Sequence, residues 1–251
     1  MILLTGFCSA SYAADIAQPS GTDWAGFFAG INAGANMSQG DLSTRVEYAN
    51  EYFYPEEVEL ANDAGNMSFS QSGFTGGAQL GYNFQHDDLV FGLEADLAYP
   101  GINASEKDSR TYPCCAPSSF TLKQDLSVGW LGTARAKLGF ASGKALFYGT
   151  GGLAFGNVSY QSDFSDDYEN GAVSSSSSSE VKLGWSAGGG VEWMMTESVS
   201  LKLEYLYYDL GDVSAASGAF RSGGRDYDVK FDRSASVSGS IVRAGLNWHF
   251  N

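Results

Sequence analysis

The chain has 251 residues, a formal net charge of −15 and a sequence pI near 4.3. A balance this acidic argues against nucleic-acid binding, which needs basic side chains that displace counterions from the phosphates. The chain contains 32 glycines and 14% aromatic residues, but no run of about 18 apolar residues, so no membrane-spanning helix is expected. Glycine and aromatic residues in short alternating segments are typical of β-barrels.

Residues 1–14 resemble a secretory signal peptide, because an apolar stretch is followed by small residues, Ser11 and Ala13, near a cleavage point at Ala14. The basic start that is usual in such signals is missing. A polar leader is expected over residues 15–23, and a single barrel domain over residues 24–251. Export would place Cys114 and Cys115 in an oxidising compartment. A disulfide between them, a bond to another chain and two free thiols all stay open.

Eight segments alternate apolar with polar or small residues at a period of two, which predicts β-strands with two different environments. In the last segment Val242, Leu246 and Trp248 share one face, and Arg243 and Asn247 share the other. The glycine-rich fifth segment gives no clear assignment of its faces. The eight segments cover about residues 24–37, 72–85, 89–99, 126–141, 145–158, 180–195, 199–209 and 240–251.

The connections between these segments alternate between long and short. The long polar connections, about residues 38–70, 100–122, 157–179 and 210–236, are expected to be loops, and the serine run in the third predicts flexibility. Long outer loops, short periplasmic turns and an even number of strands characterise outer-membrane barrels. The predicted fold is therefore an all-β, eight-stranded, antiparallel, up-and-down transmembrane β-barrel.

A soluble eight-stranded barrel, such as a lipocalin, is the competing fold, and it would place its apolar face inside. In this chain nearly every strand charge shares a face with glycine, serine, threonine and asparagine. The opposite face is apolar along whole strands and ends in aromatic residues such as Tyr99, Phe140, Trp248 and Phe250, as the interfacial girdles of membrane barrels do. We therefore expect the apolar face to contact lipid and the charged face to line the lumen.

The charges of the lumen face have both signs. A barrel of about eight strands is just wide enough for its interior side chains to fill, and buried charges persist when they are paired. We hypothesise a salt-bridge network that plugs the lumen; a narrow conduction path for small or ionic solutes is the alternative. The predicted network comprises Glu94, Asp96, Arg135, Lys137, Lys182, Glu192, Lys202, Glu204 and Arg243.

No catalytic constellation is evident, and no enzyme activity, cofactor or metal site is predicted. The two histidines, His86 in a short turn and His249 near the periplasmic end, lie far from the outer surface, where barrel enzymes place a serine–histidine pair. The acidic loops offer the oxygen ligands that Ca²⁺ or Mg²⁺ prefers, but solvated loop charge is the simpler explanation.

Several motifs resemble a known family. They are WAGFFAGINAG at 24–34, GGAQLGYNF at 76–84, TGGLAFG at 150–156, LEYLYYDLG at 203–211 and IVRAGLNWHF at 241–250. Together they are similar to the Omp25/Omp31-like porin family of alphaproteobacterial outer-membrane proteins, within the OmpA/OmpX-type eight-stranded barrels. Members usually end on an aromatic residue, whereas here Asn251 follows Phe250.

The resemblance implies an integral protein of the cell outer membrane, in contact with lipid and lipopolysaccharide. It also implies assembly by the barrel-assembly machinery, which reads the terminal strand containing Trp248 and Phe250. Relatives are called porins, surface immunogens or haemin-binding proteins. The predicted function is a non-enzymatic role in envelope structure and in surface contact with a host or other partner through the loops. A narrow porin and loop-mediated haemin capture are the alternatives.

Overall fold

The computed structural model describes residues 22–49, 52–168, 171–215 and 218–250. The predicted signal peptide and most of the leader lie outside these ranges. The elements are β1 (Gly26–Ala49), α1 (Pro55–Gly65), β2 (Asn66–His86), β3 (Leu89–Tyr99), β4 (Ile102–Thr111), β5 (Ser119–Ser142), β6 (Ala145–Asp166), β7 (Ala172–Met194), β8 (Val199–Ala215), β9 (Phe220–Ser222), β10 (Arg225–Tyr227) and β11 (Val229–Phe250). In the described part of the chain, no helix is both long and apolar enough to cross a membrane.

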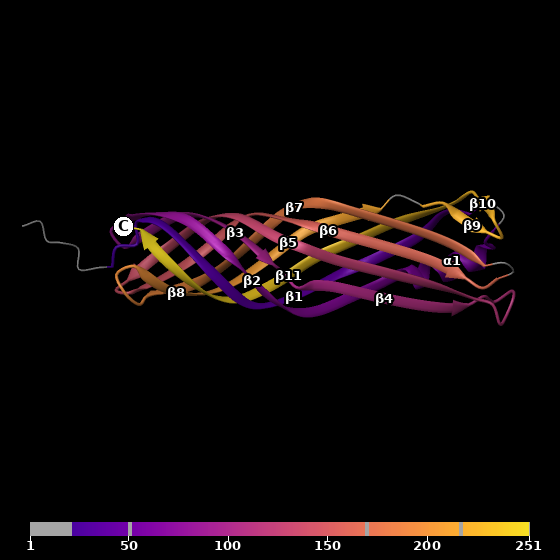
Figure 1. Cartoon of the computed structure of the whole chain (residues 1–251), viewed down its shortest axis with the longest axis horizontal. Helices are drawn as coiled ribbons and strands as arrows, with labels where there is room; N and C mark the ends of the chain where they lie inside the picture. The colour runs from indigo at the N-terminus through magenta and orange to yellow at the C-terminus, as the bar shows by residue number, and fades with distance from the viewer. Residues whose placement is uncertain (1–21, 50–51, 169–170, 216–217, 251) are drawn as a thin grey trace, which may run out of the picture.

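The strands form one closed antiparallel barrel (Figure 1). Neighbours along the chain pair from β1 to β3 and from β5 to β8, β3 pairs with β5, and β11 closes the ring by pairing with β8 and β1. β4 continues the course of β3 along β5 after a break at Gly101, whose φ of 66° is a conformation that glycine adopts readily. The predicted eight-stranded barrel is confirmed, with β9 and β10 forming a small additional hairpin.

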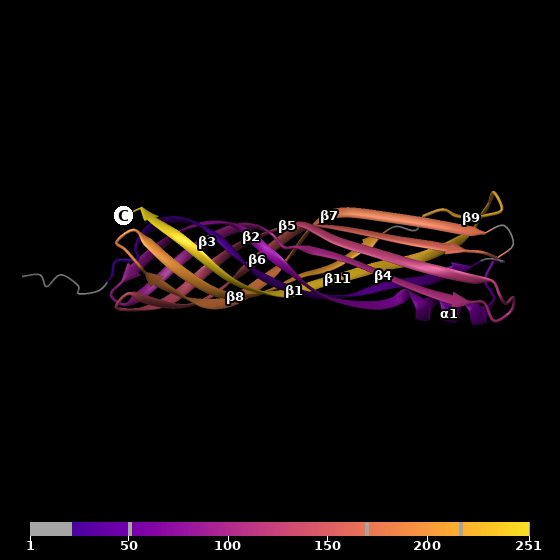
Figure 2. The ribbon, with the colours of Figure 1, turned by 60° about the horizontal axis from the view of Figure 1, so that its bottom comes forward.

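The four long connections are mostly not loops, so that prediction was wrong. β1 and β5 each have 24 residues, and the serine run lies inside β7, paired with β6. A run of identical residues has no alternation, so periodicity could not identify this strand. The strands thus continue far beyond the predicted segments and form a long outer extension of the barrel, at the end where α1, β9 and β10 lie (Figures 1 and 2).

The two faces of the barrel wall exchange character where the extension begins. On β2 the outward residues are Ser68, Ser70 and Ser72 in the extension, followed by apolar residues such as Phe74, Leu80 and Phe84. β1 makes the same change after Met37, and Met37 pairs with Ser72 and with Ser240 of β11. The inversion therefore lies at one level on neighbouring strands. Because the outward side chains of β1 and β2 are apolar on only one side of this level, it marks the outer surface of the membrane.

Inside the barrel, side chains are arranged in layers that can be followed along β5. Ala141 belongs to an apolar cluster at the periplasmic end, Arg135 belongs to a charged layer, and Leu131 begins the apolar core of the extension. Phe120 belongs to an aromatic cluster at the outer tip. The continuous alternation predicted for residues 126–141 is wrong at one point. A β-bulge between Val128 and Leu131 reverses the two faces, so Leu126 and Val128 point inward.

α1 fills a gap in the wall of the extension, between the ends of β1 and β4 (Figure 2). β2 starts only at Asn66, so the last residues of β1 have no strand partner on that side. The buried small residues Ala61 and Ala64 allow close packing, and the Asn62 side chain accepts a hydrogen bond of 2.7 Å from the backbone N–H of Val46. The helix therefore covers an otherwise open sheet edge.

Candidate functional site

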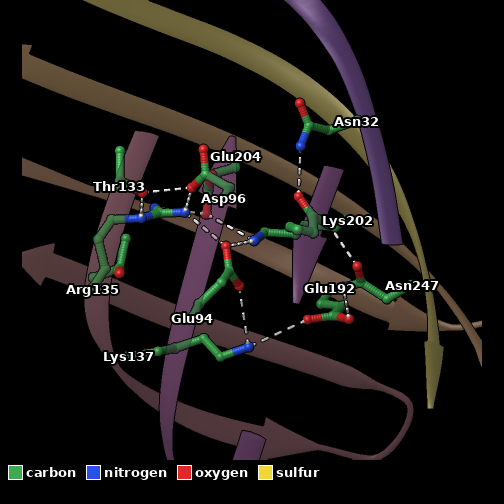
Figure 3. Close-up of polar contacts among 12 residues, drawn as sticks. Asn32, Glu94, Asp96, Thr133, Arg135, Lys137, Glu192, Lys202, Glu204 and Asn247 are labelled. Carbon is green, nitrogen blue, oxygen red and sulfur yellow. Dashed lines mark hydrogen bonds and ion pairs between the residues drawn. The ribbon is translucent and has the colours of Figure 1, made fainter. Parts of the chain in front are cut away.

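The charged layer of the lumen is built by the register of five strands. Glu94 of β3 is directly opposite Arg135 of β5, and Arg243 of β11 is opposite Glu204 of β8. The register therefore brings opposite charges together on neighbouring strands. In Figure 3 the labelled side chains, among them Glu94, Arg135 and Glu204, converge inside the barrel. The eight charged side chains of this ionic layer, all with less than a tenth of their surface exposed, are Glu94, Asp96, Arg135, Lys137, Glu192, Lys202, Glu204 and Arg243.

Arg135 lies at the centre of the ionic layer. Its guanidinium nitrogens lie 2.7 Å from Glu94, 2.9 Å from Asp96 and 3.2 Å from Glu204. Three carboxylates from two other strands thus share one cation, and the planar guanidinium has enough N–H groups to donate to all of them. Because β3 and β8 are not neighbours in the ring, Arg135 links walls that lie across the lumen.

Glu204 is the matching acidic centre. Arg243 Nη2 lies 2.5 Å away, Lys202 Nζ 3.1 Å away, and Tyr148 donates a hydrogen bond of 2.9 Å to the same carboxylate. With Arg135, three cations therefore surround this one acid. Lys202 also bonds Glu94 at 2.6 Å, and Arg243 bonds Asp96 at 3.1 Å, so the contacts form a continuous network rather than separate pairs.

The periplasmic side of the ionic layer is looser. Lys137 Nζ lies 3.9 Å from Glu94 and 3.7 Å from Glu192, beyond hydrogen-bond distance. Its ammonium group also lies 4.6 Å from the centre of the Phe28 ring, a cation–π contact. Glu192 is opposite Lys202 in register, as the hairpin geometry predicts, but its closer polar contacts are to Ser200 and Asn247.

One predicted member, Lys182, does not belong to the ionic layer. It lies at the point where β7 and β8 separate, beyond their last described pair at Trp185 and Asp209, and it pairs with Glu180 at 3.1 Å. Its side chain is 22% exposed, because a long lysine at this opening can reach water. Without it the ionic layer contains four carboxylates and four cationic side chains, so its formal charge is zero.

Sequence reasoning missed the neutral polar groups that surround the ionic layer. Thr133 bonds both Asp96 and Arg135, and Asn32, Gln79 and Asn247 form a chain of amide hydrogen bonds that ends on Glu192 (Figure 3). The sequence places Asn247 on the same face as Arg243, but it does not indicate the hydrogen bonds of these residues. Thr133 and Asn247 lie two and four residues from Arg135 and Arg243 on the same strand faces, and this spacing is the signal that identifies them. Asn32 and Gln79 lie on β1 and β2, which carry no charge of the ionic layer, so only the polar face of their strands indicates them.

The buried His249 has a serine and a carboxylate beside it, which sequence reasoning did not anticipate. Its Nε2 lies 2.9 Å from Ser200 Oγ and 3.4 Å from Glu192 Oε1. A catalytic triad needs the carboxylate on the opposite ring nitrogen, whereas here both partners lie at Nε2. Ser200 also donates its hydroxyl proton to Glu192 and is fully buried. The arrangement therefore lacks both the geometry and the access of a hydrolase site.

The lipid-facing side of the same strands carries the predicted aromatic residues. Trp248 and Phe250 project outward from β11 with roughly half of each side chain exposed. Tyr99 and Phe140 also face outward. On β6, whose faces the sequence left unassigned, Phe147 and Leu153 face outward and Leu146 and Tyr148 face inward.

A second candidate site is a pocket of about 370 Å³ at the outer tip. α1 supplies Glu57, and the segments around it supply tyrosines from four separate parts of the chain. Cys114 and Cys115 are joined in a disulfide at this pocket, which selects one of the three arrangements that the sequence left open. The lining residues are Tyr52, Phe53, Tyr54, Glu57, Tyr112, Cys114, Tyr168 and Tyr227.

Among solved structures, the chain is similar to the outer-membrane protein OprG from Pseudomonas aeruginosa. The identity is 14%, the TM-score is 0.48, and the match covers 93% of this chain and 100% of that one. It is also similar to the neisserial surface protein NspA, with 16% identity, a TM-score of 0.40 and coverage of 89% and 97%.

Among curated proteins, the chain is 32% identical to the 31 kDa outer-membrane immunogenic protein of Brucella melitensis biotype 1, over 97% of this chain and 95% of that protein. It is also 32% identical to the 22 kDa outer membrane protein of Rhizobium leguminosarum bv. viciae, over 63% and 64% of the two chains. The family model for the outer membrane protein beta-barrel domain matches residues 1–250. These findings confirm the resemblance drawn from the motifs and the cell outer membrane as the location, and the chain belongs to the outer-membrane β-barrel protein family.

Proposed function

We propose that this protein is a non-enzymatic barrel with a closed lumen, which serves envelope structure and presents a rigid outer extension for surface contact. Outer-membrane lipid and lipopolysaccharide surround the apolar band, and the barrel-assembly machinery recognises the terminal strand with Trp248 and Phe250. The observation that carries the proposal is the ionic layer, in which eight buried charges cancel and bridge opposite walls.

The ionic layer supports a closed lumen for two reasons. Its side chains make contacts of 2.6–3.2 Å between strands that are not neighbours in the ring, so a passing ion would have to separate them. Their charges also balance, so the layer offers a passing ion no net attraction that would repay the loss of its water. A narrow porin needs mobile charges along a wet path instead.

The apolar core of the extension supports closure independently. Leu42, Phe69, Leu126 and Leu206 are among the buried side chains that fill the barrel above the ionic layer. Apolar constrictions exclude ions because they do not hold water. A solute that passed the ionic layer would therefore meet a second barrier before reaching the outer surface.

Conductance of the purified monomer in planar bilayers tests this proposal. We expect no stable open steps from the wild-type protein. Because two layers close the lumen, we also expect none from Arg135→Ala, which disrupts only the ionic layer; Arg221→Ala, at an exposed pair, is the matched control. Large, stable steps from the wild-type monomer would refute closure and support the narrow porin. Steps from Arg135→Ala alone would show that the ionic layer is the only barrier.

A further inference from the structure

The pocket at the outer tip combines aromatic walls with a buried acid. Its tyrosine rings meet edge to face: the centres of Tyr52 and Tyr227 lie 5.1 Å apart at 69°, and those of Tyr112 and Tyr168 lie 6.2 Å apart at 69°. Rings held in this way present their faces in several directions around one space. The negative face of an aromatic ring attracts cations, and such cages are the usual recognition device for quaternary ammonium groups.

Glu57 provides the negative charge of this pocket. It is 5% exposed, and none of the lysines or arginines in the described ranges lies within ion-pair distance of it. Its Oε2 accepts a hydrogen bond of 2.9 Å from the backbone N–H of Tyr54 at the start of α1, where the helix dipole also favours an anion. Its Oε1 lies 2.9 Å from Cys114 Sγ, a disulfide sulfur that has no proton to give.

A second carboxylate, Asp166, adds to the negative potential beside the same rings. The hydroxyls of Tyr52 and Tyr112 donate to its Oδ2 at 2.8 and 2.9 Å. Burial and this carboxylate raise the pKa of both tyrosines well above the usual value, so the phenols stay protonated and their rings stay neutral. These two hydroxyls are engaged by Asp166, which orients the rings.

From this geometry we propose that the pocket binds a small organic cation of the quaternary ammonium type, with the tyrosine rings around the methyl groups and Glu57 as the counter-charge. A volume of about 370 Å³ lies within the range of small-ligand sites. The net charge of −15 favours the approach of cations to the protein. The inference concerns the outer tip and does not depend on closure of the lumen, so binding and conductance can fail separately.

Choline and its neutral isostere 3,3-dimethyl-1-butanol provide the test, by calorimetric titration of the full chain refolded in detergent. We expect saturable choline binding with a Kd of about 1 mM or tighter, and binding of the isostere at least about tenfold weaker, because only the charge differs. Equal binding of the two compounds, or no saturable binding of choline, would overturn the proposal.

Two variants locate the site. Glu57→Gln keeps an acceptor for the Tyr54 N–H but removes the charge, and we expect at least about tenfold weaker choline binding. Glu59→Gln removes the same charge from the exposed side of the same helix and should bind as the wild type does. Tyr227→Leu, which keeps apolar bulk without the ring, should also bind choline at least about tenfold more weakly. This variant tests the location of the site if Glu57→Gln does not fold. Unchanged binding in the folded variants would refute the assignment.

Discussion

Replacing Glu204 with alanine is expected to destabilise the folded barrel by about 3–5 kcal/mol, the usual cost of removing one partner from a buried ionic network. Glu204 contacts Arg135, Lys202 and Arg243, so its loss leaves three cations with too few acids and a net charge of +1 in the ionic layer. The free energy of unfolding, from urea titrations of the protein folded into lipid vesicles, measures the effect.

The control for this variant is Glu180→Ala. Glu180 also pairs with a lysine, Lys182, but its side chain is 43% exposed, and exposed ion pairs contribute little. Its unfolding midpoint should match that of the wild type. Glu204→Gln keeps the side-chain volume and should still be clearly destabilised, since charge rather than size is lost. If Glu204→Ala lowers the free energy of unfolding by less than about 1 kcal/mol, the ionic layer does not hold the barrel together.

The second large effect is expected from Leu80→Arg. Leu80 faces outward near the middle of the apolar band of β2, with 62% of its surface exposed. An arginine on the lipid face near the membrane centre costs about 2–4 kcal/mol, because the guanidinium must leave water or distort the bilayer. The same vesicle titration should show this decrease in the free energy of unfolding.

Ser70→Arg on the same strand and the same face is the matched comparison. Ser70 lies beyond the inversion, in the extension, where outward side chains are polar and exposed. The substitution should change stability by no more than about 0.5 kcal/mol, as surface replacements usually do. If the two variants lower the free energy of unfolding equally, the inversion does not mark the surface of the membrane.

The membrane-spanning half of this fold could be predicted from the sequence because its two environments differ strongly. β3, expected at residues 89–99, begins at Leu89 and ends at Tyr99, and alternation alone places Leu93 outside and Glu94 inside. Opposite charges on neighbouring strands then indicated the ionic layer, apart from Lys182. The register that opposes Glu94 to Arg135 could not be predicted in this way, because a long connection and not a short turn joins their strands.

The sequence did not predict the extension, because there the apolar residues of the alternating pattern face inward and the polar residues face outward. On β1 the inward residues beyond the inversion include the apolar Leu42, and the outward residues include Asp41 and Arg45. Polar composition therefore suggested loops, although the strands continue with water outside and an apolar core inside. Strand β7 is harder still, because serine occupies both of its faces at residues 174–179. The outer pocket draws its tyrosines from distant segments, so no local pattern could reveal it.

Depth-dependent fluorescence quenching can locate the inversion of the two faces on a single strand. A fluorescent label at a single cysteine would be placed at Leu80 or Ser70 in a cysteine-free background, and lipids brominated along their acyl chains would serve as quenchers. We expect strong quenching at position 80 and almost none at position 70, ten residues along the same face of β2. Equal quenching at both positions, or stronger quenching at position 70, would contradict the inversion.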